Sequence, residues 1–142
     1  MTTLLLVDDE VPFVETMSKR LNKRNMSILT AFSGQEALDL LKKNNNVDVV
    51  ILDVKMPGMD GIDVLKEIKK DYPLIQVIML TGHGTIESGI EGMKRGAFDY
   101  LTKPCNIDVL LNKVKEAKEI KAKHEEKITQ ARIEQIALRR GD

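Results

Sequence analysis

The sequence predicts an α/β fold in which a parallel sheet of five strands is covered by helices on both faces. Five short apolar runs recur along the chain, and each is followed by a segment with the apolar spacing of a helix. The third run, VDVVILD, is apolar on both faces, as a central parallel strand must be. Strands that alternate with helices are joined by right-handed crossovers, so all five strands should end at one edge of the sheet.

Apolar runs of strand length define the sheet. The expected strands cover residues 4–7, 26–32, 47–53, 75–80 and 97–101. The first two helices have clear signals as well. Val14, Met17 and Leu21 repeat at helical spacing, and Ser33 with Glu36 three residues later forms a capping box that begins the second helix.

The remaining helices differ in the strength of their signals. Residues 61–70 form an amphipathic pattern that ends at Tyr72-Pro73. Residues 85–94 predict a weaker helix because Gly89 and Gly92 lie inside it. Asn106 can cap the final helix.

Composition limits the classes of function. The chain has 142 residues, and its 22 basic side chains equal its 22 acidic ones. A neutral chain argues against a general nucleic-acid or membrane-surface binder. Cys105 is the single cysteine, so no intramolecular disulfide can form, and the N-terminus has neither a signal peptide nor a membrane span. We therefore expect a cytoplasmic protein with no direct contact to membranes or nucleic acid.

Polar side chains follow the predicted strands at the edge where ligands bind in such sheets. Asp8 and Asp9 follow the first strand and Asp53 ends the third, while Thr81 and Lys103 follow the fourth and fifth. Each residue alone is typical of a turn, but the set has a chemical meaning. Three carboxylates would repel one another, and a hard cation such as Mg²⁺ would remove that conflict. A cation, an ammonium and a hydroxyl around one carboxylate would receive a phosphoryl group, with Asp53 as the nucleophile.

The motifs that carry these residues resemble a known family. LLLVDDE, VVILDVKMPGMDG, VIMLTG and GAFDYLTKP are similar to the motifs of receiver domains of bacterial two-component response regulators. The stretch GAFDYLTKPCNIDVLL is most similar to the nitrogen-regulation subfamily. The resemblance spans residues 4 to about 117, and it implies the strand order 2-1-3-4-5 in a doubly wound sheet.

The resemblance also implies a role for each acidic residue. Asp53 would accept a phosphoryl group from a histidine of a sensor histidine kinase or a phosphotransfer protein. Asp9 and Asp53 would bind Mg²⁺ directly and Asp8 through water, and the backbone carbonyl of Lys55 would complete the protein's share of the ligands.

Other positions would sense the phosphoryl group. Thr81 and Lys103 would contact its oxygens, and Tyr100 would be the aromatic switch that turns inward when Thr81 moves. The resemblance further implies a cis Lys103–Pro104 bond and an influence of His83 on the rate of dephosphorylation.

The C-terminal part has no Pro or Gly from Ile107 to Arg140, which predicts one continuous helix roughly 50 Å long. The domain needs only its first part, so we divide the chain into a receiver domain, residues 1–117, and a charged helical extension, residues 118–142. A coiled-coil seam is poorly specified because Lys121, His124 and Gln135 interrupt it. The extension could therefore pair in a homodimer, stay solvated, dock a partner or be a linker.

Three functions compete at this point. The first is a receiver that switches a protein-interaction surface toward a downstream protein target and is not an enzyme. The alternative is a receiver fragment of a longer DNA-binding transcriptional regulator. A phosphatase-class enzyme is disfavoured, because Lys55 occupies the position where that class has a second acid.

Overall fold

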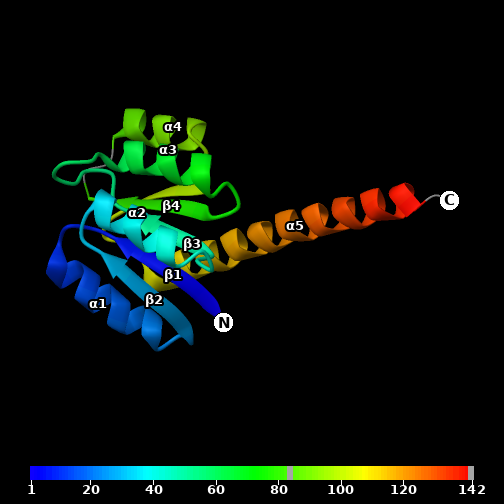
Figure 1. Ribbon diagram of the computed structural model, residues 1–142. Helices are drawn as coiled ribbons and strands as arrows, with labels where there is room; N and C mark the ends of the chain where they lie inside the picture. Colours follow the sequence, from blue (N-terminus) through cyan, green and yellow to red (C-terminus); the bar gives the residue numbers. More distant parts are fainter. Residues whose placement is uncertain (83–84, 141–142) are drawn as a thin grey trace.

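A parallel five-stranded sheet forms the centre of the protein in the computed structural model, which describes residues 1–82 and 85–140 (Figure 1). Its strand order is β2-β1-β3-β4-β5, so the predicted doubly wound sheet with its order 2-1-3-4-5 is confirmed. The strands are β1 Thr2–Val7, β2 Met26–Ala31, β3 Val49–Leu52, β4 Gln76–Thr81 and β5 Asp99–Thr102. Their ends differ from the predicted ones by at most two residues.

Five helices alternate with the strands, as predicted. They are α1 Val11–Asn22, α2 Gly34–Lys43, α3 Gly61–Asp71, α4 Ile86–Lys94 and α5 Ile107–Arg140. The Ser33 hydroxyl caps α2 by accepting from the Glu36 amide at 3.2 Å. The Glu36 carboxylate accepts from the amide of Phe32 instead of Ser33, so the capping box is shifted by one residue on that side.

Alternation along the strands divides the core into two layers. In β1, Leu4 and Leu6 face the layer under α1 and α5, whereas Leu5 and Val7 face the layer under α2 and α3. All four residues of β3 are buried, which is why its sequence has no polar face. The sheet is thus covered on both sides, and its polar chemistry is confined to its two ends.

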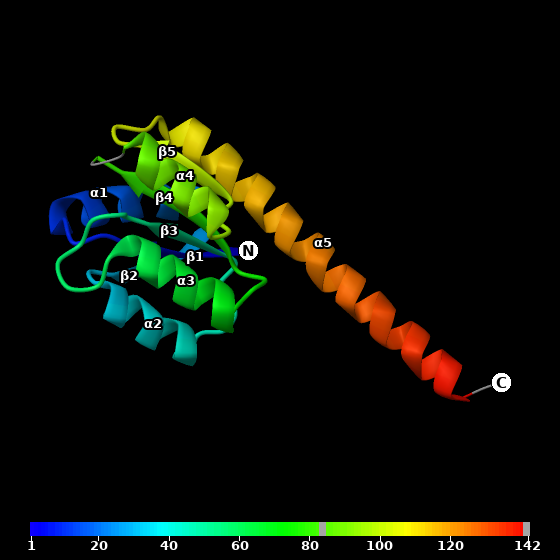
Figure 2. The same ribbon diagram turned by 90° about the horizontal axis from the view of Figure 1, so that it is seen from above.

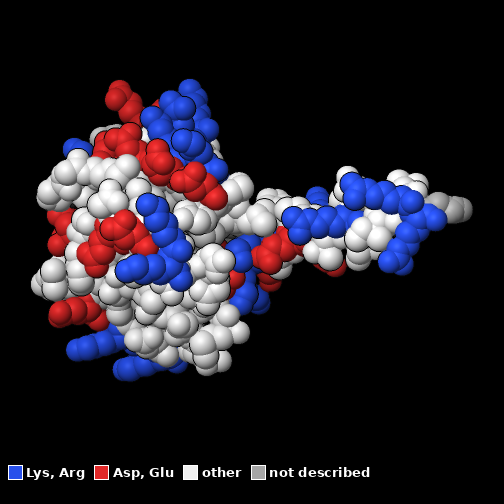
Figure 3. All heavy atoms as spheres, in the orientation of Figure 1, with Lys and Arg blue, Asp and Glu red and all other residues white. Residues whose placement is uncertain are grey.

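Helix α5 leaves the domain partway along its length (Figures 1 and 2). Leu110, Val114 and Ala117 are buried against the sheet, whereas every residue from 122 to 140 is exposed. We call residues 122–140 the tail helix. Figure 3 shows basic side chains spread along it, and Ile128, Ile133, Ile136 and Leu138 are exposed between them.

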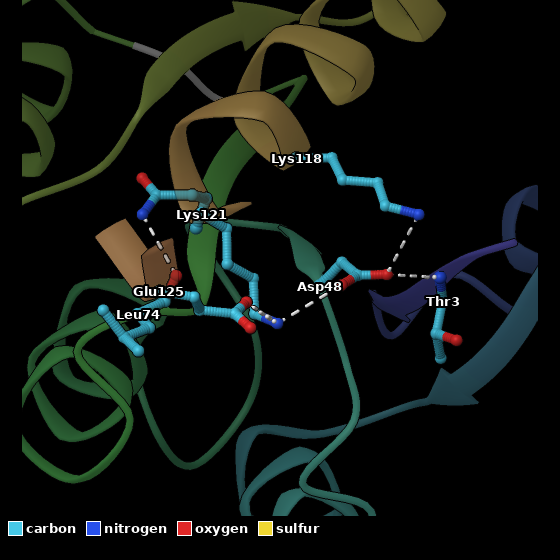
Figure 4. A network of polar contacts seen from close by, with 7 residues as sticks. Thr3, Asp48, Leu74, Lys118, Lys121 and Glu125 are labelled. Atoms are coloured by element: carbon cyan, nitrogen blue, oxygen red, sulfur yellow. Dashed lines mark hydrogen bonds and ion pairs between the residues drawn. The ribbon is translucent and has the colours of Figure 1, made fainter. Parts of the chain in front are cut away.

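The point where α5 departs is fixed by a polar network around Asp48, just before β3 (Figure 4). One Asp48 oxygen accepts from the Thr3 amide at 2.9 Å, and the other lies 3.3 Å from the Lys121 ammonium. Lys121 also pairs with Glu125 at 2.8 Å. The first turn beyond the buried part of α5 is therefore tied to the starts of β1 and β3.

No helix in the described part of the chain is long and apolar enough to cross a membrane. The expected cis bond between Lys103 and Pro104 is present.

Candidate functional site

The loops that follow β1, β3, β4 and β5 meet at the carboxyl-terminal edge of the sheet, and backbone hydrogen bonds fix their starts. The Asp53 amide donates to the Val7 carbonyl at 3.0 Å, which continues the pairing of β3 with β1. The Lys103 amide donates to the Thr81 carbonyl at 2.8 Å, and this bond continues the pairing of β5 with β4. Residues far apart in sequence are thereby brought to one place.

The close approach of α3 depends on Gly61. A Cβ at this position would collide with the backbone of Asp53 and Val54, so no larger residue fits without a shift. The Gly61 amide donates to the Val54 carbonyl at 2.7 Å. The loop after Asp53 is thus folded back tightly, and α3 begins directly beside the acidic residue.

Asp53 is a buried carboxylate that the protein does not fully satisfy. Its side chain is enclosed, with the residue 2% exposed, and its Oδ1 atom has no hydrogen-bond partner among the described residues. Burial raises the pKa of this carboxyl group above its ordinary value, and the Asp8 charge acts in the same direction. The Thr81 hydroxyl and the Lys103 ammonium oppose that rise. An unpaired oxygen of this kind is expected where a ligand or a cation completes the site.

Whereas Asp53 keeps one oxygen unpaired, both carboxylate oxygens of Asp8 have partners. Its Oδ2 atom lies 2.5 Å from the Lys103 ammonium, and its Oδ1 atom accepts from the Glu10 amide at 2.9 Å. Burial lowers the pKa of Lys103, but the hydrogen bond and charge of Asp8, together with Asp53 and Glu10, raise it overall. Lys103 therefore stays charged and is held on the Asp8 side of the site.

The donor set fits a hard divalent cation. One carboxylate oxygen each from Asp8, Glu10 and Asp53 lies within 4.8 Å of the others, and oxygen atoms are the ligands that Mg²⁺ prefers. Asp53, the residue with the unpaired oxygen, is thus one member of this group. The Asp9 side chain is exposed and outside this group, and Lys55 is exposed in the loop before α3. Direct binding by Asp9 and by the Lys55 carbonyl stays a prediction.

Tyr100 lies in β5, and its ring faces α4 at Gly89 and Gly92. Its hydroxyl is 2.7 Å from the Ser88 hydroxyl, and its ring packs partly buried against the core. The same ring lines a groove of about 700 Å³ between α4 and β5, together with Ile86, Ile90 and Met93. Its role as a switch stays a prediction.

Two residues at the site were missed from the sequence. Glu10 adds a third carboxylate to the group of Asp8 and Asp53, and the Phe13 ring lies 4.0 Å below the Lys103 ammonium. Glu10 could have been suspected, since it directly follows the acidic pair. Phe13 gave no signal, because an aromatic residue in the first turn of a helix usually packs in a core. His83 lies outside the described residues.

Comparisons with known proteins agree with this fold. The family model of the response regulator receiver domain matches residues 4–115. Transcriptional regulatory protein GlrR of Escherichia coli is 40% identical over 116 residues, which are 82% of this chain and 26% of that protein. DNA-binding transcriptional regulator NtrC of Klebsiella pneumoniae is 39% identical over 103 residues, 72% of this chain and 22% of that protein. A receiver domain from Clostridium thermocellum has a TM-score of 0.82 and 40% identity, covering 86% of this chain and 98% of that one.

A parallel sheet in this order with an acidic group at its carboxyl-terminal edge defines a doubly wound domain of the receiver type. The chain belongs to the response regulator receiver domain family of two-component systems. Its resemblance to the nitrogen-regulation regulators is confirmed by relatives named NtrC and NtrX-like. The chain spans about a quarter of the length of the curated relatives that it matches.

Proposed function

We propose that Asp53 accepts a phosphoryl group from a phosphohistidine on a sensor histidine kinase or a phosphotransfer protein, in a Mg²⁺-dependent reaction. The observation that carries this proposal is the buried Asp53 carboxylate with one unpaired oxygen beside Lys103 and further carboxylates. An Asp53 oxygen forms the new bond to phosphorus while the phosphorus–nitrogen bond of the donor breaks. The electron pair of that bond returns to the imidazole nitrogen.

The surrounding residues stabilise the transferred group. Bound Mg²⁺ would neutralise charge on the phosphoryl oxygens, and the residues that would hold it are Asp8, Asp9 and Asp53 with the Lys55 carbonyl. Lys103 would leave Asp8 and donate to a phosphoryl oxygen, and the Thr81 hydroxyl would donate to another. Thr81 ends β4, which pairs with β3, and Lys103 directly follows β5, which pairs with β4.

The output is a change of surface and not the turnover of a substrate. Phosphorylation adds charge and strong acceptors at Asp53 and draws Thr81 toward them, which frees space for the Tyr100 ring to move inward. Tyr100 lines the apolar groove between α4 and β5, so its motion would reshape that groove. A downstream protein target would read this change. The protein is then a switch that catalyses its own phosphotransfer and is not an enzyme in the usual sense.

A second candidate is a receiver that belongs to a longer DNA-binding transcriptional regulator. Two observations favour it: the chain covers about a quarter of relatives that are named as transcriptional regulators, and α5 continues far beyond the sheet. In that case residues 1–117 would be the receiver domain and residues 118–142 a helical connection. Its exposed isoleucines could also pair with a second copy in a homodimer.

The test uses beryllium fluoride, a mimic of the aspartyl phosphate, with Mg²⁺ present. Wild-type protein should bind the mimic and Asp53→Asn should not, as measured by isothermal titration. Light scattering on the same samples then reports the mass. A mass that doubles only with the mimic indicates switched dimerisation, a dimer in both states indicates a clamp by the tail helix, and a monomer throughout indicates a relay or a binder that awaits its partner. Equal binding by Asp53→Asn would refute the proposal.

A further inference from the structure

We propose that Phe13, assisted by Glu10, forms a holding site that keeps the Lys103 ammonium away from Asp53 until a phosphoryl group arrives. Phe13 and Glu10 are then positioning residues, because they act through Lys103. The inference rests on the proposed function of Lys103 as the donor to the phosphoryl oxygens. It goes beyond that function by assigning a competing site for the same ammonium.

Three groups from the β1–α1 region contact the ammonium of Lys103. Its ammonium lies 2.5 Å from Asp8 Oδ2, 3.4 Å from Glu10 Oε1 and 4.0 Å from the centre of the Phe13 ring. Its side chain is 12% exposed, so these contacts are largely shielded from water. A cation over an aromatic face is attracted by the ring quadrupole, and the attraction grows when water is excluded.

The holding site is rigid because it is built on the start of a helix. Glu10 is the residue at the N-terminal boundary of α1, and its amide is fixed by the bond to Asp8. Phe13 lies in the first turn and packs against the core layer under α1 and α5. Pro12 also lies in that first turn, where its fixed backbone angle suits a helix. The ring therefore cannot follow Lys103 if the lysine moves toward Asp53.

Lys103 is thus shared between two positions. A ligand that recruits it to Asp53 must release it from Asp8, Glu10 and Phe13. Weakening the holding site should therefore strengthen the binding of a phosphoryl mimic, without improving the cation site itself. Glu10 is a less clean probe, since its carboxylate also lies among the oxygens that could hold a cation. Phe13 has no charge and no metal-binding atom, so its substitution separates the two effects.

The test compares Phe13→Leu with Phe32→Leu. Phe32 is an exposed aromatic residue directly after β2, and the ring that the Lys103 ammonium contacts is that of Phe13. Beryllium fluoride is titrated at saturating Mg²⁺, and Mg²⁺ is titrated alone. We expect Phe13→Leu to bind the mimic about threefold to tenfold more tightly, with Mg²⁺ affinity changed less than about twofold. Phe32→Leu should change neither. Unchanged or weaker mimic binding by Phe13→Leu would overturn the holding site.

Two further measurements keep the test decisive if Phe13→Leu folds poorly. Phe13→Met should also tighten mimic binding, and Phe13→Tyr, which keeps a ring, should match the wild type. In NMR spectra of the wild type, the Lys103 side-chain protons next to the ammonium should be shifted upfield by the ring and lose that shift with the mimic. A shift that persists in the bound state would overturn the inference. If the wild type binds no mimic at all, the proposed function fails and this inference fails with it, whereas normal binding without the Phe13 effect sinks the inference alone.

Discussion

The two ends of the sheet each carry a carboxylate–lysine pair, and the pairs differ in how completely their oxygens are satisfied. At the amino-terminal end, Asp48 contacts the Thr3 amide through one oxygen and Lys121 through the other (Figure 4). At the carboxyl-terminal end, Asp8 is similarly occupied, but the neighbouring Asp53 keeps an unpaired oxygen. The first end is balanced and fixes a helix. The second has more carboxylates than cations and is prepared for a ligand.

This difference shows how one kind of side-chain pair can serve structure or chemistry. At the amino-terminal end, Lys118 pairs with Asp48, and Lys121 pairs with both Asp48 and Glu125, so two lysines face two acidic side chains. At the other end, the acidic group of Asp8, Glu10 and Asp53 has Lys103 as the cation that contacts it. Because burial makes uncompensated charge costly, the excess must be offset by a cation from solution or by protonation. The uncompensated carboxylates at the carboxyl-terminal end therefore lower the folding stability, whereas the paired carboxylates at the amino-terminal end do not.

The largest expected effect comes from removing the unsatisfied carboxylate. Asp53→Asn should weaken beryllium fluoride binding by more than about 100-fold, because the mimic needs the carboxylate oxygen. In a metal-free buffer the same change should raise the free energy of unfolding by about 1 kcal/mol, since a buried charge is lost. Calorimetric titration and urea unfolding measure the two effects. Destabilisation by Asp53→Asn would show that this carboxylate is balanced after all.

The satisfied carboxylate should behave in the opposite way. Asp48→Ala removes a charged hydrogen bond to the Thr3 amide and the ion pairs of α5, so unfolding should become easier by about 2 kcal/mol. Mimic binding should stay within about twofold of the wild type, because Asp48 lies at the far end of the sheet. Asp71→Ala, an exposed acid at the end of α3, is the matched control and should have little effect on urea unfolding. Equal effects of the two variants would remove the structural role assigned to Asp48.

Adding Mg²⁺ should stabilise the folded protein, because the cation would offset the excess of carboxylates at the carboxyl-terminal end of the sheet. A cation that binds only the folded protein stabilises it by about 1.4 kcal/mol when its free concentration is ten times the dissociation constant. Wild-type protein and Asp48→Ala should gain the same amount, whereas Asp53→Asn should gain less. Thermal melting at increasing Mg²⁺ measures these gains. A gain that Asp53→Asn shares in full would place the cation elsewhere.

The smallest expected effect is the pH dependence of the Lys121 ion pairs at the amino-terminal end of the sheet. Burial lowers the pKa of Lys121, but its bonds with Glu125 and Asp48 and their charges raise it overall. A raised pKa in the folded state means that this stabilisation is complete below the ordinary lysine pKa and is lost as pH rises through the folded value. Helix content measured by circular dichroism should therefore fall more in the wild type than in Lys121→Met at alkaline pH. Parallel curves would show that Lys121 adds nothing to the anchoring of α5.

The sequence pattern predicts the sheet, its order and the residues at its reactive end because these follow from apolar periodicity and from motifs. Asp8, Asp53, Thr81 and Lys103 all follow or end strands, and parallel strands end together. The contacts at the amino-terminal end of the sheet were not predicted from the sequence. Lys121 interrupts the apolar seam of α5 as read from the sequence, yet its position is explained by Asp48, which is 73 residues away.

Contacts of this range cannot be predicted from local periodicity, since they depend on how far one helix passes beyond the sheet. The same reason applies to Phe13, whose ring meets Lys103 only after α1 and β5 are placed together. The reactive centre was thus predictable from strand ends, whereas the groups that hold its lysine were not.

The central claim is that Asp53 is the phosphoacceptor, and chemical trapping of the modified residue tests it most directly. The protein would be incubated with Mg²⁺ and acetyl phosphate, reduced with borohydride and analysed by peptide mass spectrometry. Reduction converts an aspartyl phosphate to homoserine, so the account predicts homoserine at position 53 and an unmodified Asp8 and Asp9. Homoserine at another position, or a phosphoryl group retained on a serine or threonine, would contradict it.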